Sequence, residues 1–241
     1  LMGNQKSLKD ERGSLFYDIV KILKSVKPNY FILENVRRIL TIDNKNTINQ
    51  IMTQLENIGY KVDYIVLDSK DYGIPQTRRR VFFYGFNKKL KKNIPLFAPP
   101  KKRLRKTTRD LLDIYADKKY HLSKKILKTI MKDGTGGYKS KSEIDLEVAR
   151  PLTKTMVKMH RANQDNYYSN KFILGDKKQK WVRKLTPEEA FRLQGFNDKF
   201  VKNAKKAGVS DTQLYMQAGN SVTINTVSAM IEHLINNDWF L

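Results

Sequence analysis

The sequence predicts an α/β fold in which a mostly parallel, doubly wound sheet is joined to a second, smaller and loop-rich domain. Three observations support this prediction. Apolar strands alternate with amphipathic helices from residue 13 to residue 84, the composition changes near residue 88, and helical patterns return at Thr186. We therefore expect three segments: the α/β domain, the smaller domain and a final helix that returns to the first domain, at residues 1–96, 97–218 and 219–241.

The first domain shows strands and helices in turn. The expected elements are a helix, a strand, a second helix and two further strands, at residues 13–26, 30–33, 44–58, 62–67 and 81–84. Pro28 follows the end of the first helix, and Gly59 ends the second. A buried strand that ends on a carboxylate delivers polar groups to the carboxyl edge of a sheet, so Glu34 is the first candidate site residue.

The second domain begins after a change of character. Residues 88–106 contain three prolines and a run of basic side chains, which marks a domain boundary. Short helical patterns follow at residues 109–115 and 123–131, and residues 133–180 form a Gly-rich, weakly patterned segment. From Thr186, the sequence Thr-Pro-Glu-Glu combines a capping residue, a first-turn proline and a Glu at the third helical position, which predicts the start of a helix.

Composition narrows the range of functions. The formal net charge of +23 predicts a polyanionic partner, with nucleic acid favoured over membrane lipid. Residues 101–180 hold 22 basic and 9 acidic side chains, whereas residues 181–241 hold 7 basic and 6 acidic ones. The surface that contacts the polyanion is therefore expected in the middle of the chain. The absence of Cys excludes disulfides, Cys-type zinc sites and a thiol nucleophile within these residues, and three scattered His predict no metal site. With no apolar run of membrane-spanning length and no signal peptide, we expect no membrane association and a cytoplasmic location.

Four short segments occur in a fixed order along the chain. They are Glu-Asn-Val at 34–36, Gln-Thr-Arg-Arg-Arg at 76–80, a longer block at 183–196 and Gln-Ala-Gly-Asn-Ser-Val at 217–222. In this order and at these spacings they resemble the cytosine-5 DNA methyltransferases, and only residues 97–180 stay unassigned. The resemblance implies a Rossmann-like methyltransferase sheet, S-adenosylmethionine as cofactor, duplex DNA as substrate, base flipping, and a bacterial or phage setting such as restriction–modification.

Two parts of the family pattern are missing. The family's Gly-containing cofactor loop and its Pro-Cys motif, whose thiolate is the nucleophile, are absent, and residues 3–13 look like the loop that follows Pro-Cys. The glycines at 134–137 do not replace the cofactor loop, because no strand precedes them. We expect either that a separate amino-terminal polypeptide carries the Pro-Cys motif or that the sequence is a fragment of a longer enzyme. A non-catalytic DNA-binding module of the same fold is the alternative.

The resemblance implies site roles for five residues. Addition of a thiolate to C6 of cytosine needs charge neutralised at N3 and O2, so Glu34 would face N3 and the exocyclic amine, and Arg80 would face O2. A Glu with a pKa raised by burial suits proton sharing with N3. Arg78 would contact a phosphate, although both arginines could instead belong to a solvated basic loop. Asn220 and Ser221 would help to line the cofactor pocket, with helix capping as the alternative.

The remaining candidates are polar side chains expected at the DNA. Gln76 stands beside the arginines at the entrance of a strand. Residues suited to base edges are Arg150, Arg161 and Asn163. Residues expected to follow the phosphates are Lys101, Lys102, Arg103, Arg105 and Lys106. Within the block at 183–196, Arg192 and Gln194 are expected to clasp the small domain rather than to catalyse.

Overall fold

The computed structural model describes residues 11–90, 98–134, 140–175 and 181–237. The chain divides into two compact units. Unit 1 consists of Leu1–Leu67, Arg79–Pro99 and Met230–Leu241, and unit 2 of Asp68–Arg78 and Pro100–Ala229. Of the loop expected at residues 3–13, residues 3–10 lie outside the described residues, whereas residues 11–13 belong to the first helix, so the loop prediction is wrong there. Residues 135–137 of the glycine stretch at 134–137 also lie outside the described residues. No helix within the described ranges is both long and apolar enough to span a bilayer.

Unit 1 contains a three-stranded sheet with β3 at its centre, in the order β1–β3–β2. Its elements in chain order are α1 (Glu11–Val26), β1 (Tyr30–Val36), α2 (Asn46–Asn57), β2 (Tyr60–Asp68) and β3 (Arg79–Asn87). The five elements predicted between residues 13 and 84 are therefore confirmed. Each strand is longer than predicted because residues beyond the apolar runs, polar ones such as Glu34 and Arg80 among them, continue the strands.

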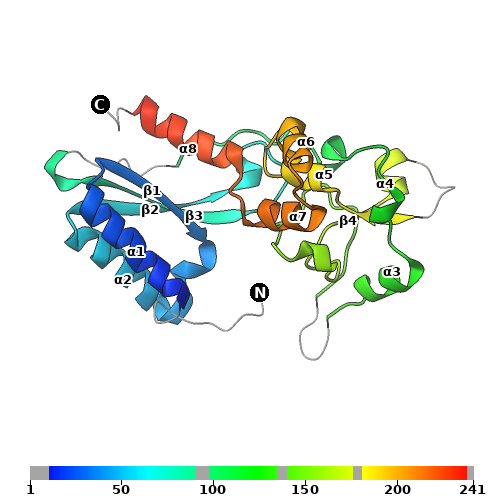
Figure 1. Cartoon of the computed structure of the whole chain (residues 1–241), viewed down its shortest axis with the longest axis horizontal. Coiled ribbons are helices and arrows are strands. Elements are labelled where there is room, and N and C mark those ends of the chain that lie inside the picture. Colours follow the sequence, from blue (N-terminus) through cyan, green and yellow to red (C-terminus); the bar gives the residue numbers. More distant parts are fainter. Residues whose placement is uncertain (1–10, 91–97, 135–139, 176–180, 238–241) are drawn as a thin grey trace. The chain divides into compact units, whose positions relative to one another are not determined.

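Helices α1 and α2 cover one face of this sheet. Leu23 of α1, Leu55 of α2 and Phe83 of β3 are buried in one apolar cluster, and Figure 1 shows both helices on the same side of the strands. Because side chains alternate along a strand, Phe82 and Tyr84 point to the opposite face. These two residues are also buried, so both faces of β3 are shielded from solvent.

Strand β3 runs antiparallel to β1, with Glu34 opposite Phe82 and Val36 opposite Arg80. The prediction of a mostly parallel sheet is wrong for this pair of strands. A parallel neighbour requires a crossover connection, usually a helix. Helix α2 provides one between β1 and β2, but residues 69–78, between β2 and β3, hold only one short 3-10 turn. The chain therefore reverses direction before β3.

Unit 2 combines short helices and loops with a two-stranded antiparallel ladder. Its elements are α3 (Lys124–Ile130), β4 (Tyr167–Ser169), α4 (Asn170–Leu174), β5 (Val182–Lys184), α5 (Pro187–Arg192), α6 (Asp198–Lys206), α7 (Asp211–Asn220) and the first part of α8 (Ile224–Asn236). Helices α3, α5 and α8 confirm predictions, whereas α6 and α7 had not been predicted. The helix predicted at residues 109–115 is only a 3-10 turn at Thr108–Leu111, because Leu112 is extended with φ −88° and ψ 140°.

A buried ion pair ties together three parts of unit 2. Glu189 is the third residue of α5 and forms the predicted capping box with Thr186, which is confirmed. Its carboxylate accepts hydrogen bonds of 2.7 and 2.6 Å from the two terminal nitrogens of Arg183 on β5, and a third of 2.7 Å from the backbone N–H of Asp113. Both charged side chains are fully buried, and their pairing satisfies groups that would otherwise be costly to remove from water.

Candidate functional site

Strands β1 and β3 bring together two of the predicted catalytic side chains. In the antiparallel register, Arg80 lies opposite Val36, two residues beyond Glu34 and on the same face of the sheet. Arg80 Nε lies 2.9 Å from Glu34 Oε1. The side chains are 17% and 29% exposed, so the pair is shielded on one side and accessible on the other.

In this pair, the positively charged guanidinium of Arg80 lies next to the carboxylate of Glu34. Burial lowers the pKa of the Arg80 guanidinium, and the Glu34 carboxylate opposes that effect. Arginine nonetheless keeps its charge in proteins. Arg80 also donates through Nη1 to the carbonyl of Arg79 over 2.9 Å, which orients its planar group. The pair thus presents acceptor oxygens and donor nitrogens side by side, a pattern that matches one edge of a planar heterocycle.

Gln76, expected at the DNA, lies in the interior of unit 2 with no exposed surface. Its Nε2 donates to the carbonyl of Leu193 over 2.6 Å, and its Oε1 accepts from the N–H of Leu152 over 3.0 Å. Its backbone pairs with Ala149 in a parallel bridge. In this structure Gln76 therefore joins segments of unit 2 through main-chain groups.

Arg78, expected at a phosphate, is also buried, with 2% of its surface exposed. Its guanidinium donates to the carbonyls of Leu152 and Gly219, each over 3.0 Å, and to that of Ser221 over 2.7 Å. The backbone N–H of Arg78 donates to Asp68 over 3.0 Å. The side chain therefore binds main-chain carbonyls from two segments far away in the sequence.

Gly219 permits this arrangement and was not singled out from the sequence as a site residue. A Cβ at this position would lie 2.3 Å from the backbone N of Lys154 and 2.3 Å from the carbonyl carbon of Thr153. Only a residue without a side chain allows the end of α7 to approach this backbone so closely. The sole signal in the sequence is the small residue before Asn220, which does not reveal what approaches it.

Asn220 and Ser221, expected in the cofactor pocket, lie at the end of α7 and not at the start of the last helix. Helix α8 begins three residues later, at Ile224, so the predicted alternative of capping its start is wrong. Ser221 Oγ instead donates to the carbonyl of Ala218 over 2.9 Å.

The fit of these two residues to S-adenosylmethionine is incomplete. The side chain of Asn220 is exposed and accessible to a ligand. Ser221, in contrast, uses its hydroxyl on Ala218 and its carbonyl on Arg78. Neither residue lines the cavities found in unit 2. Of these two residues, only Asn220 thus offers a side chain that is exposed to a ligand.

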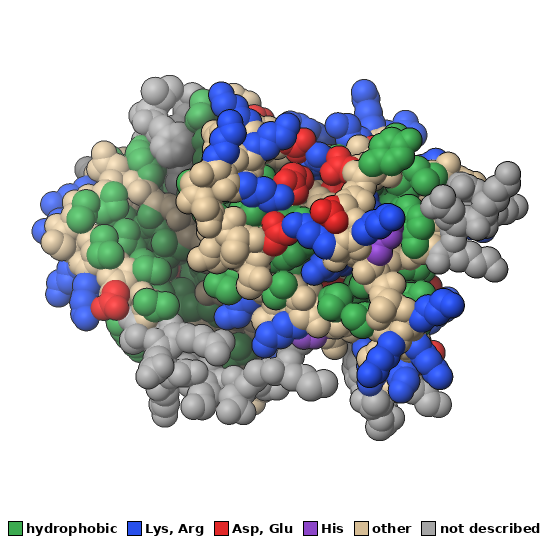
Figure 2. Space-filling model, turned by 45° about the vertical axis from the view of Figure 1, so that its right-hand side comes forward, with side chains coloured by type: hydrophobic (Ala, Val, Ile, Leu, Met, Phe, Trp, Pro, Cys, Tyr) green, Lys and Arg blue, Asp and Glu red, His purple; other side chains and the backbone are tan. Residues whose placement is uncertain are grey.

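The basic run at residues 101–106 lies on the surface of unit 2. Lys101 forms an exposed ion pair with Asp71 over 3.0 Å, and Lys102, Arg103, Arg105 and Lys106 line a cavity. Figure 2 shows Lys and Arg side chains spread widely over the visible face, with a further group at the lower right, where Figure 1 places α3. Such a distribution suits contact with an extended polyanion.

The three candidates for base edges all contact the backbone of unit 2. Arg150 Nε donates to the carbonyl of Ala162 over 3.0 Å, and Arg161 Nη1 donates to that of Asp133 over 3.1 Å. Asn163 Nδ2 lies 3.5 Å from the carbonyl of Ser140, at the limit of a hydrogen bond. Each of the three residues is partly exposed, but the Oδ1 of Asn163 is buried and has no hydrogen-bond partner in the described part of the chain.

Arg192 and Gln194 confirm the prediction that they act as clasps. Arg192 pairs with Asp198 over two contacts of 2.7 Å and with Asp113 over 2.8 Å, which raises the pKa of its guanidinium. Gln194 donates to the carbonyl of Ala218 over 2.8 Å and accepts from Thr223 Oγ1 over 2.9 Å. Arg192 thus links the end of α5 to α6, and Gln194, just beyond α5, links the chain to α7 and to Thr223.

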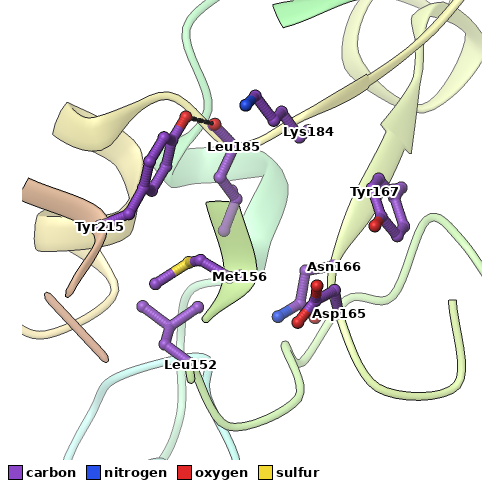
Figure 3. Close-up of a pocket in the computed structure, with 8 residues that line it drawn as sticks. All are labelled: Leu152, Met156, Asp165, Asn166, Tyr167, Lys184, Leu185 and Tyr215. Carbon is purple, nitrogen blue, oxygen red and sulfur yellow. Dashed lines mark hydrogen bonds between the residues drawn. The ribbon is translucent and has the colours of Figure 1, made fainter. Parts of the chain in front are cut away.

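A second cavity, shown in Figure 3, is too small for an organic ligand. Its volume of about 10 Å³ is near the minimum for one water molecule. Asp165 is one of its buried lining residues; burial raises the pKa of this carboxyl, and a 2.8 Å hydrogen bond from the N–H of His160 opposes that shift. Across the cavity, the hydroxyl of Tyr215 donates to the carbonyl of Leu185. We assign these groups to the packing of unit 2. No cluster of three potential metal ligands occurs within the described residues.

Comparisons with known sequences identify one family. Residues 1–236 match the model of a family described as C-5 cytosine-specific DNA methylase. The type II methyltransferase M.SsoII of Shigella sonnei is 36% identical over 97% of this chain and 60% of its own length. The type II methyltransferase M.NlaX of Neisseria lactamica is 33% identical over 96% of this chain and 71% of its own length. The chain thus spans only part of these relatives.

Solved structures show the same fold. The Entamoeba histolytica methyltransferase EhMeth matches with a TM-score of 0.69 at 20% identity, covering 98% of this chain and 72% of that one. The Dnmt2 methyltransferase of S. pombe matches with a TM-score of 0.67 at 20% identity, covering 93% and 72%. At this level of identity the likeness establishes an α/β methyltransferase fold, of which this chain holds a part.

Proposed function

The chain belongs to the family of C-5 cytosine-specific DNA methylases, and from this premise we propose that it forms the carboxyl-terminal part of a DNA (cytosine-5-)-methyltransferase. In this proposal the complete enzyme transfers a methyl group from S-adenosylmethionine to C5 of a cytosine flipped out of duplex DNA. The similarity to type II methyltransferases of bacteria supports a role in restriction–modification, in the cytoplasm of a bacterial or phage-infected cell.

The pairing of Glu34 with Arg80 carries this proposal. Cytosine displays its exocyclic amine, N3 and O2 along one edge, and nucleophilic addition at C6 is easier when charge at N3 and O2 is neutralised. We assign Glu34 to N3 and the exocyclic amine, where it shares a proton, and Arg80 to O2, where it donates hydrogen bonds. The support is geometric: the two groups lie 2.9 Å apart on neighbouring strands and remain partly accessible.

Arg78 and Gln76 receive supporting roles in this proposal. Their buried contacts with main-chain groups favour positioning of unit 2 over direct contact with a phosphate. Asn220 is our candidate for this chain's contact with S-adenosylmethionine, because its side chain is exposed. The cofactor loop and the Cys nucleophile must come from sequence outside these 241 residues, which contain no Cys. A separate amino-terminal polypeptide and a longer parent chain both satisfy this requirement.

Methyl transfer by the purified chain tests this division of labour. We expect the chain alone to transfer no label from S-adenosylmethionine to DNA, because no other side chain replaces the missing thiolate. Addition of a separate amino-terminal fragment that carries the cofactor loop and ends with the Pro-Cys motif should restore incorporation into cytosine. Incorporation by the chain alone would refute the proposal. Specific DNA binding without activity in any combination would favour a non-catalytic DNA-binding module.

We propose that recognition of DNA resides in residues 97–218, between a catalytic part at 1–96 and a returning helix at 219–241. Residues 101–180 carry a net charge of +13, which supports contact with the phosphates of a duplex. We assign the basic run at 101–106 to phosphates. Readout of base edges is assigned to Arg150, Arg161 and Asn163.

Salt titrations separate these two groups of residues. Neutralising Lys101, Lys102, Arg103, Arg105 and Lys106 together should weaken binding about equally for all duplexes. The slope of log affinity against log salt should fall by about 0.9 for each phosphate that the variant no longer neutralises. Replacing Arg161 or Asn163 with Ala should instead reduce discrimination between target and random duplexes by about 1–3 kcal/mol for each base that the variant no longer reads.

The control for these titrations lies on α6, in the part of the chain with balanced charge. Neutralising Lys199, Lys202 and Lys206 should leave both the salt slope and the discrimination close to those of the unmodified chain. If the variant of the basic run loses discrimination while the Arg161 and Asn163 variants lose only general affinity, the assignment is reversed.

A further inference from the structure

Unit 2 contains a cavity of about 720 Å³ that none of the residues assigned to catalysis lines. Its walls come from three stretches of chain, at residues 72–75, 102–106 and 192–196, and from Asn225 near the start of α8. The volume falls in the range of pockets that bind small molecules, which is about 300–1,000 Å³. The cavity is therefore large enough for a ligand and lies within one unit.

Direct contacts hold the walls of this cavity together. Tyr72 and Lys102 form a parallel bridge, in which the N–H of Lys102 donates to the carbonyl of Asp71 over 2.8 Å. Asn225 Nδ2 donates to the carbonyl of Tyr72 over 3.3 Å. Gly195 has a φ of 83°, and a Cβ there would lie 2.5 Å from Asn225 Oδ1. The glycine thus allows a left-handed conformation and a close approach at the same point.

The charged side chains that line the cavity are all cationic. Five cationic side chains and no Asp or Glu line it among the described residues. One of them, Arg192, is neutralised by Asp113 and Asp198, which lie outside the lining. By contrast, Arg103 and Arg105 form no ion pair within the part of the chain that the structure describes. A concave surface lined by cationic side chains, of which Arg103 and Arg105 form no ion pair among the described residues, concentrates anions, so the ligand is expected to carry negative charge.

The rest of the wall is apolar and includes an aromatic ring. Its apolar residues include Ile74, Pro75, Leu111 and Phe196. The ring of Phe196 is half-buried and packs edge-to-face against Phe191, with centroids 5.2 Å apart and an interplanar angle of 89°. A ring held in this way offers a surface to a flat apolar group. A ligand that matches both walls joins an anionic group to a planar ring.

We propose that this cavity binds a nucleotide, with its phosphate against Arg103 and Arg105 and its base against the apolar wall that contains Phe196. The nucleotide is either free or one unit of a nucleic-acid strand, because both present the same chemistry. The proposal rests in part on the proposed function, since Arg103 and Arg105 also belong to the DNA-binding run. The new element is the apolar wall that contacts the base. A surface that contacts only the phosphates of a duplex does not require such a wall.

Calorimetric titration of the full chain tests the proposal with three probes: inorganic phosphate, deoxyadenosine monophosphate and a short single-stranded oligodeoxyadenylate. The monophosphate should bind about tenfold more tightly than phosphate, the gain expected from one base–aromatic contact. Changing Arg103 and Arg105 together to Ala should weaken the binding of phosphate and of the monophosphate by about tenfold or more. Phe196→Leu should weaken only the monophosphate and the oligonucleotide. The matched control, Lys199→Ala with Lys202→Ala, removes equal charge outside the cavity and should leave affinities within about twofold.

The outcomes separate the sources of the nucleotide. Tighter binding of the oligonucleotide than of the monophosphate identifies a nucleic-acid strand, and the reverse identifies a free nucleotide. Equal affinity for phosphate and monophosphate, or unchanged nucleotide affinity in Phe196→Leu, overturns the proposal. If circular dichroism shows that Phe196→Leu is unfolded, Leu111→Ala replaces it and is judged by the same criterion. If the chain binds duplex DNA in a salt-dependent way but binds no nucleotide, this inference is overturned and the proposed function is not. If the chain binds the nucleotide but not duplex DNA, the proposed duplex contacts of the basic run are overturned.

Discussion

Replacing Glu34 with Gln is expected to lower kcat by about a hundredfold or more in the enzyme completed by an amino-terminal fragment with the Pro-Cys motif. The affinity of this enzyme for duplex DNA should change by less than about threefold. Gln keeps the size of Glu34 and one acceptor oxygen for Arg80, but it cannot share a proton with N3 of cytosine. The loss therefore falls on the transition state. Single-turnover incorporation of labelled methyl groups measures the chemical step, and a filter-binding titration measures the affinity for DNA.

The control for this experiment is Glu56→Gln, which removes the same charge from an exposed position on α2 in the same unit. Its activity should equal that of the unmodified enzyme. The ion pair of Glu34 with Arg80 is partly exposed, so the Gln variant should lose only about 0–1 kcal/mol of stability. Turnover of the Glu34 variant within about threefold of the control would reduce Glu34 to a polar strand end.

Replacing Glu189 with Gln is expected to destabilise unit 2 by about 3–5 kcal/mol, the usual cost of removing one partner of a buried ion pair. The guanidinium of Arg183 has no exposed surface and would lose the carboxylate that receives two of its hydrogen bonds. The N–H groups of Thr186 and Asp113 would lose a charged acceptor as well. Urea denaturation followed by circular dichroism measures the shift in midpoint and slope.

The neighbouring residue supplies a matched control. Glu188 carries the same charge on the same turn of α5, but its pairing with Lys205 is partly exposed to solvent. Glu188→Gln is therefore expected to cost about 0–1 kcal/mol. If the two variants unfold at the same urea concentration, the buried pair does not stabilise unit 2 in the way described.

Local patterns were sufficient to predict most elements of unit 1. The apolar spacing in α1 and α2 and the apolar runs of the three strands follow directly from burial on one or two faces. The direction of β3 was not predictable in this way, because it depends on residues 69–78, which pack in unit 2. Helix α6 spans only nine residues, four of them lysines, so its apolar face consists of too few residues to predict a helix from apolar spacing alone.

The candidate site was predicted unevenly for a related reason. The family resemblance indicated roles for Glu34 and Arg80 separately, and both lie just outside the apolar runs that predicted the strands. Their pairing depends on the antiparallel register of β1 and β3. The same resemblance led us to expect Arg78 at a phosphate and Gln76 beside it at the DNA. Their burial depends on main-chain groups of Leu152 and Gly219, more than 70 residues away. A sequence pattern contains no information about such distant backbone partners.

The contacts of Gln76 and Arg78 bear on how this part of the protein can diversify. Both side chains bind the backbone of Leu152, and a backbone carbonyl or N–H is present whatever side chain occupies that position. The exposed side chains of the segment that surrounds residue 152 can therefore change during evolution, and with them the DNA contacts that we propose for unit 2, without losing these anchors. Gly219 is the exception, because any side chain there would collide with Thr153. A chimera that transplants a foreign recognition segment should retain Gln76, Arg78 and Gly219 from the host.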